Sequence, residues 1–199
     1  NLTMAGFNND NIHFVGNSMI DSLIRYRDKA EKLKPWEKYG LTRKKYCLVT
    51  LHRPSNVDAI ENLSYVFELL NDIAKRIDII FPVHPRTRKG IEKIVNDISP
   101  AIKMIEPVSY LEFLGLMSSS LVVLTDSGGI QEESTYLGVQ CLTYRDNTER
   151  PVTITDGTNQ LVGTNNINAM SLIIDIINGK VKKGVIPEKW DGKTGERIA

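Results

Sequence analysis

Short strand-like segments alternate with helix-like segments along most of this 199-residue sequence, and that alternation limits the folds open to the chain. Apolar runs rich in strand formers predict strands at residues 46–51, 77–83, 102–105, 120–126, 139–144 and 160–162. Apolar residues spaced three and four apart predict helices between them, at residues 59–77, 88–98, 110–117, 129–136 and 169–178. The sequence therefore predicts an α/β fold with a mostly parallel sheet, covered by helices on both faces.

The composition is that of an ordinary soluble globular protein and argues against several other classes. The 25 Lys and Arg residues against 24 Asp and Glu residues leave a formal net charge of +1, without the basic excess of a nucleic-acid binder. No apolar run approaches the ~18 residues of a membrane span, and residues 1–11 do not have the pattern of a secretory signal. Cys47 and Cys141 lie in apolar runs, which is typical of buried thiols rather than of a disulfide or metal site. We expect a cytoplasmic protein that binds neither nucleic acid nor membrane.

Ligands of parallel α/β sheets bind at the carboxyl ends of the strands, where several polar segments stand in this sequence. HRPSNVD, residues 52–58, follows the first predicted strand and offers His52 and Arg53 to an anionic ligand. The same segment is equally consistent with a polar loop that caps the next helix through Asn56 or Asp58.

A second basic segment, PVHPRTRK at residues 82–89, follows the next predicted strand. His84 stands between two prolines, which restrict its backbone. Arg86, Arg88 and Lys89 gather at the start of a helix, where the dipole favours anions. A basic turn on the surface explains this segment somewhat better than a binding site does.

The segment TDSGGIQEES, residues 125–134, joins the most apolar predicted strand to a helix. Gly128 and Gly129 would let a ligand approach the backbone closely, and the free N–H groups at the helix start would bind phosphate oxygens. Glu133 lies four residues beyond Gly129, hence on the same helical face and ~6 Å along the axis, where it could accept hydrogen bonds from a ribose diol. The alternative is a plain tight turn before an acidic helix start.

The segment RDNTERP, residues 145–151, follows the next predicted strand and is dense in charge. Arg150 could bind the same phosphates with its planar guanidinium group. The alternative is a solvated turn that contains an Arg–Glu pair of little energetic value. Taken singly, these segments are ambiguous, and what distinguishes them is that they converge on one edge of the sheet.

Seven segments together resemble one family, the non-hydrolysing UDP-N-acetylglucosamine 2-epimerases. In chain order they are GNSMIDSL, LVTLHRPSNVD, PVHPRTRK, EPVSYLEFLGLM, LTDSGGIQEES, RDNTERP and WDGKTGERI. The resemblance runs from about residue 16 to residue 198 and covers the C-terminal half of that family. It implies a Rossmann-like domain, the second half of a glycosyltransferase-B fold.

The same resemblance implies the activity and its partners. The family interconverts UDP-N-acetylglucosamine and UDP-N-acetylmannosamine for cell-envelope polysaccharides, by eliminating and re-adding UDP without an external cofactor or metal. Full-length members are usually homodimers, and their proton-transferring carboxylates come from an N-terminal domain that we expect to lie outside this sequence. We therefore expect residues 1–39 to be an interdomain connection and first helix, 40–184 the UDP-binding domain, and 185–199 a tail that crosses to the other domain. The isolated domain should bind UDP and turn nothing over.

The family's site residues map onto this sequence by motif. Ser127, Gly128 and Gly129 resemble the diphosphate cradle, and Glu133 resembles the ribose ligand. His52 and Arg150 resemble the catalytic charged groups that face the phosphates, and Phe113 resembles the residue that lines the uracil pocket. His84 falls in the segment that helps bind a second, activating UDP-sugar in bacterial members.

Some positions depart from the family pattern and leave the exact activity open. HRPSN stands where bacterial members often have HRREN, and Val108 stands where a glutamine contacts uracil. The substrate could therefore be a related UDP-amino sugar such as UDP-2,3-diacetamido-glucuronate. The chain could also be the donor domain of a glycosyltransferase, or a non-catalytic nucleotide-sugar sensor.

Overall fold

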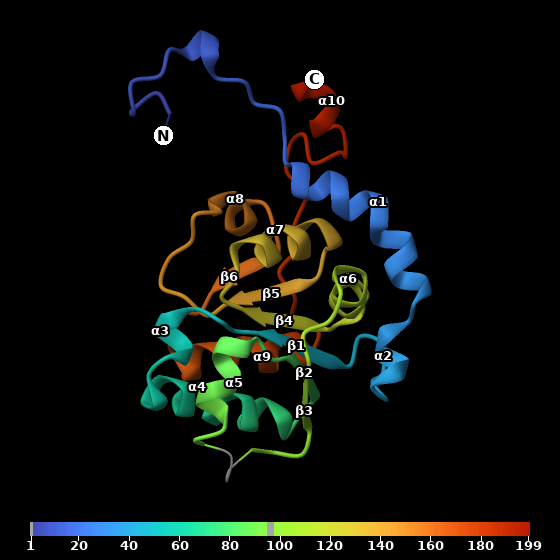
Figure 1. The fold of residues 1–199 in the computed structure, drawn as a ribbon, viewed down its shortest axis with the longest axis vertical. Coiled ribbons are helices and arrows are strands. Elements are labelled where there is room, and N and C mark those ends of the chain that lie inside the picture. Colours follow the sequence, from blue (N-terminus) through green and yellow to red (C-terminus); the bar gives the residue numbers. More distant parts are fainter. Residues whose placement is uncertain (1, 95–97) are drawn as a thin grey trace.

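A six-stranded, all-parallel sheet forms the centre of the computed structural model, which describes residues 2–94 and 98–199 (Figure 1). The strands are β1 (Tyr46–Thr50), β2 (Asp78–Pro82), β3 (Ile102–Ile105), β4 (Val122–Thr125), β5 (Gln140–Thr143) and β6 (Asn159–Leu161). Around them lie η1 (Asn9–Asn11), α1 (Ser18–Lys32), α2 (Pro35–Lys38), α3 (Pro54–Val57), α4 (Ile60–Ala74), α5 (Pro85–Ile91), α6 (Tyr110–Ser119), α7 (Gly128–Leu137), α8 (Pro151–Thr155), α9 (Asn166–Ile177) and α10 (Thr194–Ile198). All six predicted strands are present, so the predicted α/β fold with a parallel sheet is confirmed.

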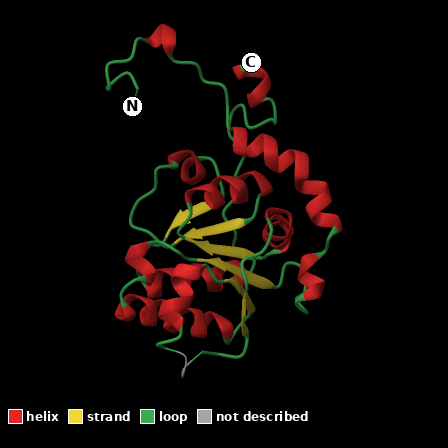
Figure 2. Cartoon of the chain, viewed as in Figure 1, coloured by secondary structure: helices red, strands yellow, loops and turns green. Residues whose placement is uncertain are grey.

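Helices cover both faces of the sheet and divide the core into two apolar clusters (Figures 1 and 2). The side chains of β1 alternate between them: Cys47 and Val49 pack with α4 and α9, whereas Tyr46 and Leu48 pack with α1 and α6. This period of two is the geometry of a strand buried on both faces. The continuous apolar run of the sequence is therefore explained by burial on both sides.

The strand order, β3-β2-β1-β4-β5-β6, reverses between β1 and β4. The chain first adds β2 and β3 on one side of β1, then crosses back to place β4 on the other side, with Leu48 opposite Val123 and Thr50 opposite Thr125. Loops leave the two central strands in opposite directions at this point, and open α/β sheets bind ligands there, in the crevice beyond the carboxyl ends of the strands. The topology therefore singles out the segments after β1 and β4 as the place for a ligand.

One glycine permits the close packing of α1 against α6. A Cβ at Gly115 would lie 2.7 Å from the carbonyl oxygen of Ala30 and 2.8 Å from the ring of Pro35. Both are backbone or ring atoms that cannot rotate away, so a larger residue would push the two helices apart. This contact sets the distance between α1 and the middle of α6, a helix that contributes to the site described below.

Several elements differ from the predicted ones. The helix expected at residues 88–98 begins at Pro85, because His84 caps it and proline suits the first helical position; it ends at Ile91, and residues 95–97 lie outside the described ones. The short helices α2, α3, α8 and α10 were not predicted, since each has too few residues to show a helical period.

The C-terminal segment returns to the beginning of α1 (Figure 1). The N–H of Gly195 donates to Asp21 over 2.8 Å, and the Lys189 ammonium donates to the carbonyl of Phe14 over 2.7 Å. Gly16 has φ +109°, and a Cβ there would lie 2.4 Å from the Lys189 carbonyl oxygen. The division into an interdomain connection, a UDP-binding domain and a crossing tail stays a prediction.

Candidate functional site

Asp126 lies one residue beyond β4, at the point where the strand order reverses, and its side chain is fully buried. Its carboxylate accepts the backbone N–H groups of His52 over 3.0 Å and of Arg53 over 2.8 Å, and the side-chain amide of Asn56 over 3.0 Å. Burial alone would raise the pKa of this carboxyl, but the donors around it outweigh burial and hold the pKa below its usual range. Asp126 therefore ties the segment after β1 to the end of β4 as a buried anion.

The same carboxylate orients His52. Nδ1 of His52 lies 2.9 Å from Oδ1 of Asp126, and the side chain stays 41% exposed. The hydrogen bond to Asp126 raises the pKa of His52, against the opposing effects of partial burial and of two nearby arginines. With Nδ1 engaged, Nε2 is the nitrogen left for a ligand, and the raised pKa favours a positive charge on the ring.

Neither residue considered as a helix cap fills that role. Arg53 precedes α3, and Ala59 precedes α4 with no side chain capping it. Asn56 is instead buried against Asp126, and Asp58 pairs with Arg86 over 2.8 Å. The capping interpretation of residues 52–58 is thus wrong, because the amide of Asn56 is needed inside the crevice to satisfy a buried carboxylate.

The start of α7 lies beside this crevice. Ser127 precedes the helix, and no side chain caps the first turn, so its N–H groups face outward without an intrahelical partner. At Gly128 a Cβ would have room, since its nearest neighbour would be Nε of Arg150 at 4.0 Å. At Gly129 a Cβ would lie 2.8 Å from the methyl group of Met19. Steric demands of the fold therefore do not require glycine at position 128.

Arg150 lies over this helix start, with Nε 4.0 Å from the place of a Cβ at Gly128, and its role as a phosphate ligand stays a prediction. Nε of Arg150 is 3.1 Å from Oε1 of Glu132, and the arginine side chain is 45% exposed. The Arg–Glu pair expected for a solvated turn also exists, but it joins Arg145 to Glu149 with distances of 3.0 and 2.7 Å. The segment after β5 thus holds two arginines, one paired within its own loop and one directed to α7.

Glu133 of α7 contacts the first residue of α6, Tyr110. Glu133 is 5% exposed and accepts a hydrogen bond of 2.9 Å from the Tyr110 hydroxyl. Burial raises the pKa of Glu133, and Glu132 adds to the shift while Tyr110 opposes it. Phe113, one turn along α6 from Tyr110, is half-buried against the apolar cluster that includes Ile130.

A buried polar network that was not predicted supports α7 from behind. Oε1 of Gln131 accepts from the Thr148 hydroxyl over 2.6 Å and from the Asn159 amide over 3.1 Å. Asn159 also donates to Thr153 over 3.0 Å, at the start of the segment that follows Arg150. Asp126 stands at the carboxyl end of a strand, so the rule that ligands of parallel sheets bind there could have identified it. Gln131 and Asn159 carry no such local signal in the sequence.

The basic segment after β2 forms ion pairs at the surface. Nδ1 of His84 accepts the N–H of Arg86 over 3.2 Å, Arg86 pairs with Asp58, and Arg88 pairs with Glu106 over 2.8 Å. The ring of His84 lies 5.7 Å from that of His52, centroid to centroid, beside a cavity of about 460 Å³ lined by Arg86 and Lys89. A role for His84 in binding a second ligand stays a prediction.

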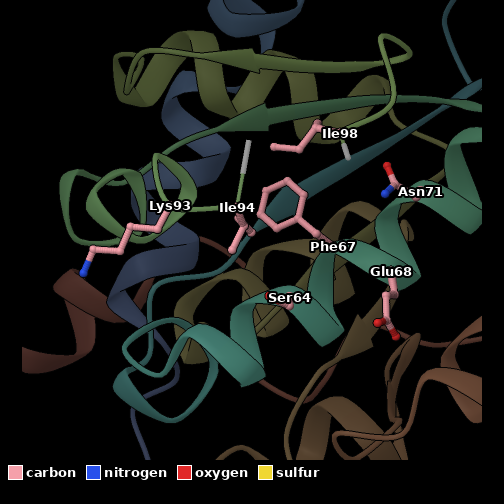
Figure 3. Close-up of a pocket in the computed structure, with 7 residues that line it drawn as sticks. All are labelled: Ser64, Phe67, Glu68, Asn71, Lys93, Ile94 and Ile98. Atoms are coloured by element: carbon pink, nitrogen blue, oxygen red, sulfur yellow. The ribbon is translucent and has the colours of Figure 1, made fainter. Parts of the chain in front are cut away.

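Another cavity lies apart from these residues. It has about 290 Å³ and is formed by α4 and by residues that follow α5, with Phe67 and Ile94 on its wall and Glu68 and Lys93 at its rim (Figure 3). None of the predicted site residues lines it. Within residues 2–94 and 98–199, no helix has the length and apolar character needed to cross a membrane.

Comparison with known proteins links this geometry to one family. The family model for UDP-N-acetylglucosamine 2-epimerase matches residues 1–199. A UDP-N-acetylglucosamine 2-epimerase of Methanococcus maripaludis is 40% identical over 182 residues, which cover 87% of this chain and 50% of that protein. A UDP-2,3-diacetamido-2,3-dideoxy-D-glucuronate 2-epimerase of Pseudomonas aeruginosa is 38% identical over 151 residues, which cover 75% of this chain and 41% of that protein.

The crystal structure of the UDP-N-acetylglucosamine 2-epimerase of Methanocaldococcus jannaschii, in complex with UDP-GlcNAc and UDP, is also similar. It is 39% identical, with a TM-score of 0.85 over 99% of this chain and 56% of that chain. The chain thus spans about half the length of these relatives, and the expected Rossmann-like fold of glycosyltransferase-B type is confirmed. With a family model matched over its whole length, this chain belongs to the UDP-N-acetylglucosamine 2-epimerase family.

Proposed function

We propose that this chain is the UDP-binding half of an epimerase that interconverts UDP-N-acetylglucosamine and UDP-N-acetylmannosamine. The observation that carries the proposal is the convergence of His52, Arg150 and the uncapped start of α7 at the point where the strand order reverses. Two cations and a helix N-terminus at one crevice match the charge of a diphosphate. The known complex of the M. jannaschii relative with UDP-GlcNAc and UDP supports the same ligand class.

Each part of UDP has a proposed partner. The diphosphate lies on Ser127, Gly128 and Gly129, between the cationic groups of His52 and Arg150. The ribose diol donates to Glu133, whose position one helical turn beyond Gly129 fits the length of the nucleotide. The uracil ring packs near Phe113, on the start of α6.

The proposed reaction begins with elimination. A base removes the proton from C2 of the sugar, the C1–O bond breaks, and its electron pair leaves with UDP, giving a 2-acetamidoglucal. Re-addition of UDP and a proton on the other face of C2 gives the epimer. Negative charge grows on the β-phosphate as the C1–O bond breaks, so His52 and Arg150 stabilise the transition state more than the bound substrate.

This chain supplies the leaving-group side of that reaction. The groups that move the C2 proton belong to an N-terminal domain that we place outside this chain, so the chain alone should bind UDP without turnover. The assembled protein would be a homodimer. One relative is named a UDP-2,3-diacetamido-2,3-dideoxy-D-glucuronate 2-epimerase. The corresponding UDP-sugar is a second candidate substrate, because the same UDP-binding half would serve both sugars.

Calorimetric titration with UDP, with UMP and ADP as controls, tests the proposal. We expect UDP to bind most tightly, UMP to lose the contacts to the β-phosphate, and ADP to lose those to the base. Equal affinity for all three nucleotides would contradict both the diphosphate site and the uracil pocket. Measurement of C2–H exchange with solvent, after a separately expressed N-terminal domain is added, distinguishes an epimerase from a sensor that binds and does not turn over.

A further inference from the structure

Glu132 is a carboxylate placed beside a site that we propose for an anion. It lies on α7, three residues beyond Gly129, and its side chain is 10% exposed. A negative charge at this place repels a diphosphate, so Glu132 is not a ligand for it. Its neighbour Glu133 already has a proposed role at the ribose, which leaves Glu132 without a function in the site.

The contacts of Glu132 are specific. One oxygen, Oε1, lies 3.1 Å from Nε of Arg150 in an ion pair and accepts a hydrogen bond of 3.0 Å from the side-chain amide of Asn17. Asn17 is itself fixed, because its Oδ1 accepts the N–H of Met19 over 3.0 Å as the N-cap of α1. Glu132 therefore joins the start of α1 to the arginine that lies over the start of α7.

The contact with Glu132 restricts the conformations of the Arg150 side chain. A long, half-exposed arginine samples many rotamers, and a ligand that binds it must order them. A carboxylate beside Nε holds the guanidinium group at its inner edge. Nη1 also donates to the carbonyl of Glu149 over 3.4 Å, which leaves Nη2 and the second N–H of Nη1 for phosphate oxygens. The partly exposed arginine gains a preferred direction before the ligand arrives.

We infer that Glu132 is a positioning residue for Arg150, and that Asn17, the N-cap of α1, holds Glu132 in place. The direction of the Arg150 side chain therefore depends on the position of the start of α1. The inference rests on the proposed function of Arg150 as a phosphate ligand. It adds a route by which a displacement of the segment before α1 reaches the phosphate site, through a hydrogen bond and an ion pair that share one oxygen atom.

Binding of UDP and UMP to three variants tests the inference. Glu132→Ala should weaken UDP about tenfold and leave UMP nearly unchanged, because Arg150 loses its direction. Glu132→Gln should restore most of the affinity, since its amide oxygen can occupy the same place beside Nε and still accept from Asn17. Asn17→Ala should give a smaller loss of the same kind. Failure of Glu132→Gln to rescue, or equal losses for UDP and UMP, would overturn the inference.

Two controls separate this role from charge and from general instability. Glu149→Ala removes a carboxylate one residue from Arg150 that pairs with Arg145, and it should not weaken UDP. In an Arg150→Ala background, Glu132→Ala should cause no further loss; an added tenfold loss would mean that Glu132 acts elsewhere.

A measurement without ligand keeps the inference separate from the proposed function. In the free chain, the Nε–H signal of Arg150 should exchange with water more slowly than in the Glu132→Ala variant, as read by NMR. Equal exchange in both would overturn the inference even if UDP binds. Slower exchange in the original chain, with no selective binding of UDP, would uphold the positioning role and refute the proposed ligand.

Discussion

Two segments of this chain contain nearly the same residue types, but the carboxylates that they contact differ greatly in burial. HRPSN follows β1 and VHPRT follows β2, so each places a histidine, an arginine and a proline at the carboxyl end of a strand. After β1, the carboxylate partner is Asp126, which is fully buried and comes from the neighbouring strand β4. After β2, the partners Asp58 and Glu106 have side chains that are 46% and 77% exposed.

The difference teaches that the partner, more than the motif, makes the site. A buried carboxylate needs several donors and therefore organises the loop that supplies them. An exposed ion pair is screened by water and organises little. The strand order decides which segment receives the buried partner, because β4 lies next to β1 and not next to β2.

The largest effect should come from Asp126→Asn. The substitution removes the buried charge and places an amide among groups that all donate hydrogen bonds, so we expect a loss of about 3 kcal/mol or more in unfolding free energy. Urea denaturation measures it. Asp58→Asn is the matched control after β2 and should have little effect; similar losses for both variants would remove the distinction between the two segments.

The next effect concerns ligand binding. Arg150→Ala should weaken UDP by about 10- to 100-fold, the cost of a charged hydrogen bond or two, and weaken UMP far less, because only UDP has the β-phosphate. Calorimetry gives both constants. Arg86→Ala, from the segment after β2, should change neither. If UDP and UMP lose affinity equally, Arg150 does not contact the β-phosphate.

A smaller effect is expected at the ribose end, which has no counterpart after β2. Glu133→Gln should weaken UDP about tenfold or less, because the carboxylate accepts from both ribose hydroxyls. The comparison ligand is 2′,3′-dideoxy-UDP, which lacks the diol and should bind both proteins alike. Equal losses for the two ligands would make Glu133 a structural residue, held by Tyr110 alone.

The smallest effect is the pH dependence of stability from the His52–Asp126 pair. The pKa of His52 is raised above 6.5, so its contribution is complete below that pH and is lost as pH rises through the folded value. The pKa of Asp126 is lowered below 3.8, so its contribution is present above that pH and is lost as pH falls through the folded value. Stability should therefore fall gradually above pH 6.5, and urea titrations at several pH values measure the slope. His52→Gln should flatten the slope in this range, whereas an unchanged slope would mean that other groups cause it.

The extent to which the fold and the candidate site could be predicted from the sequence differs between elements. The strands carry strong local signals, because β-branched and apolar runs buried on both faces show in the sequence itself. The helix after His84 was misplaced because its first turn is basic and proline-rich, and its apolar residues begin only later. The roles of His52, Arg150 and Glu133 are predictions from their motifs, and the rule for parallel sheets places the segments that carry them at one edge.

The organisation around those residues could not be predicted. Asp126 and Asn56 are 70 residues apart, and only the return of the chain to β4 brings them together. Glu132 and Asn17 are 115 residues apart and belong to different helices. Partnerships over such distances depend on the tertiary fold and leave no periodic trace in the sequence.

Gly128 lets folding and binding be altered separately. A methyl group there would meet nothing closer than 4.0 Å. Gly128 has no positive φ, and replacing such a glycine by alanine stabilises a protein by roughly 0.4–1 kcal/mol, because the unfolded chain has fewer conformations to lose. A designer who optimised the thermal stability of the free chain would choose alanine and, on the proposed function, would fill the space that a phosphate oxygen needs. Placed in the assembled protein, the Gly128→Ala variant is thus the natural inactive reference for genetic complementation, because its phenotype would report lost ligand binding in a protein that still accumulates normally.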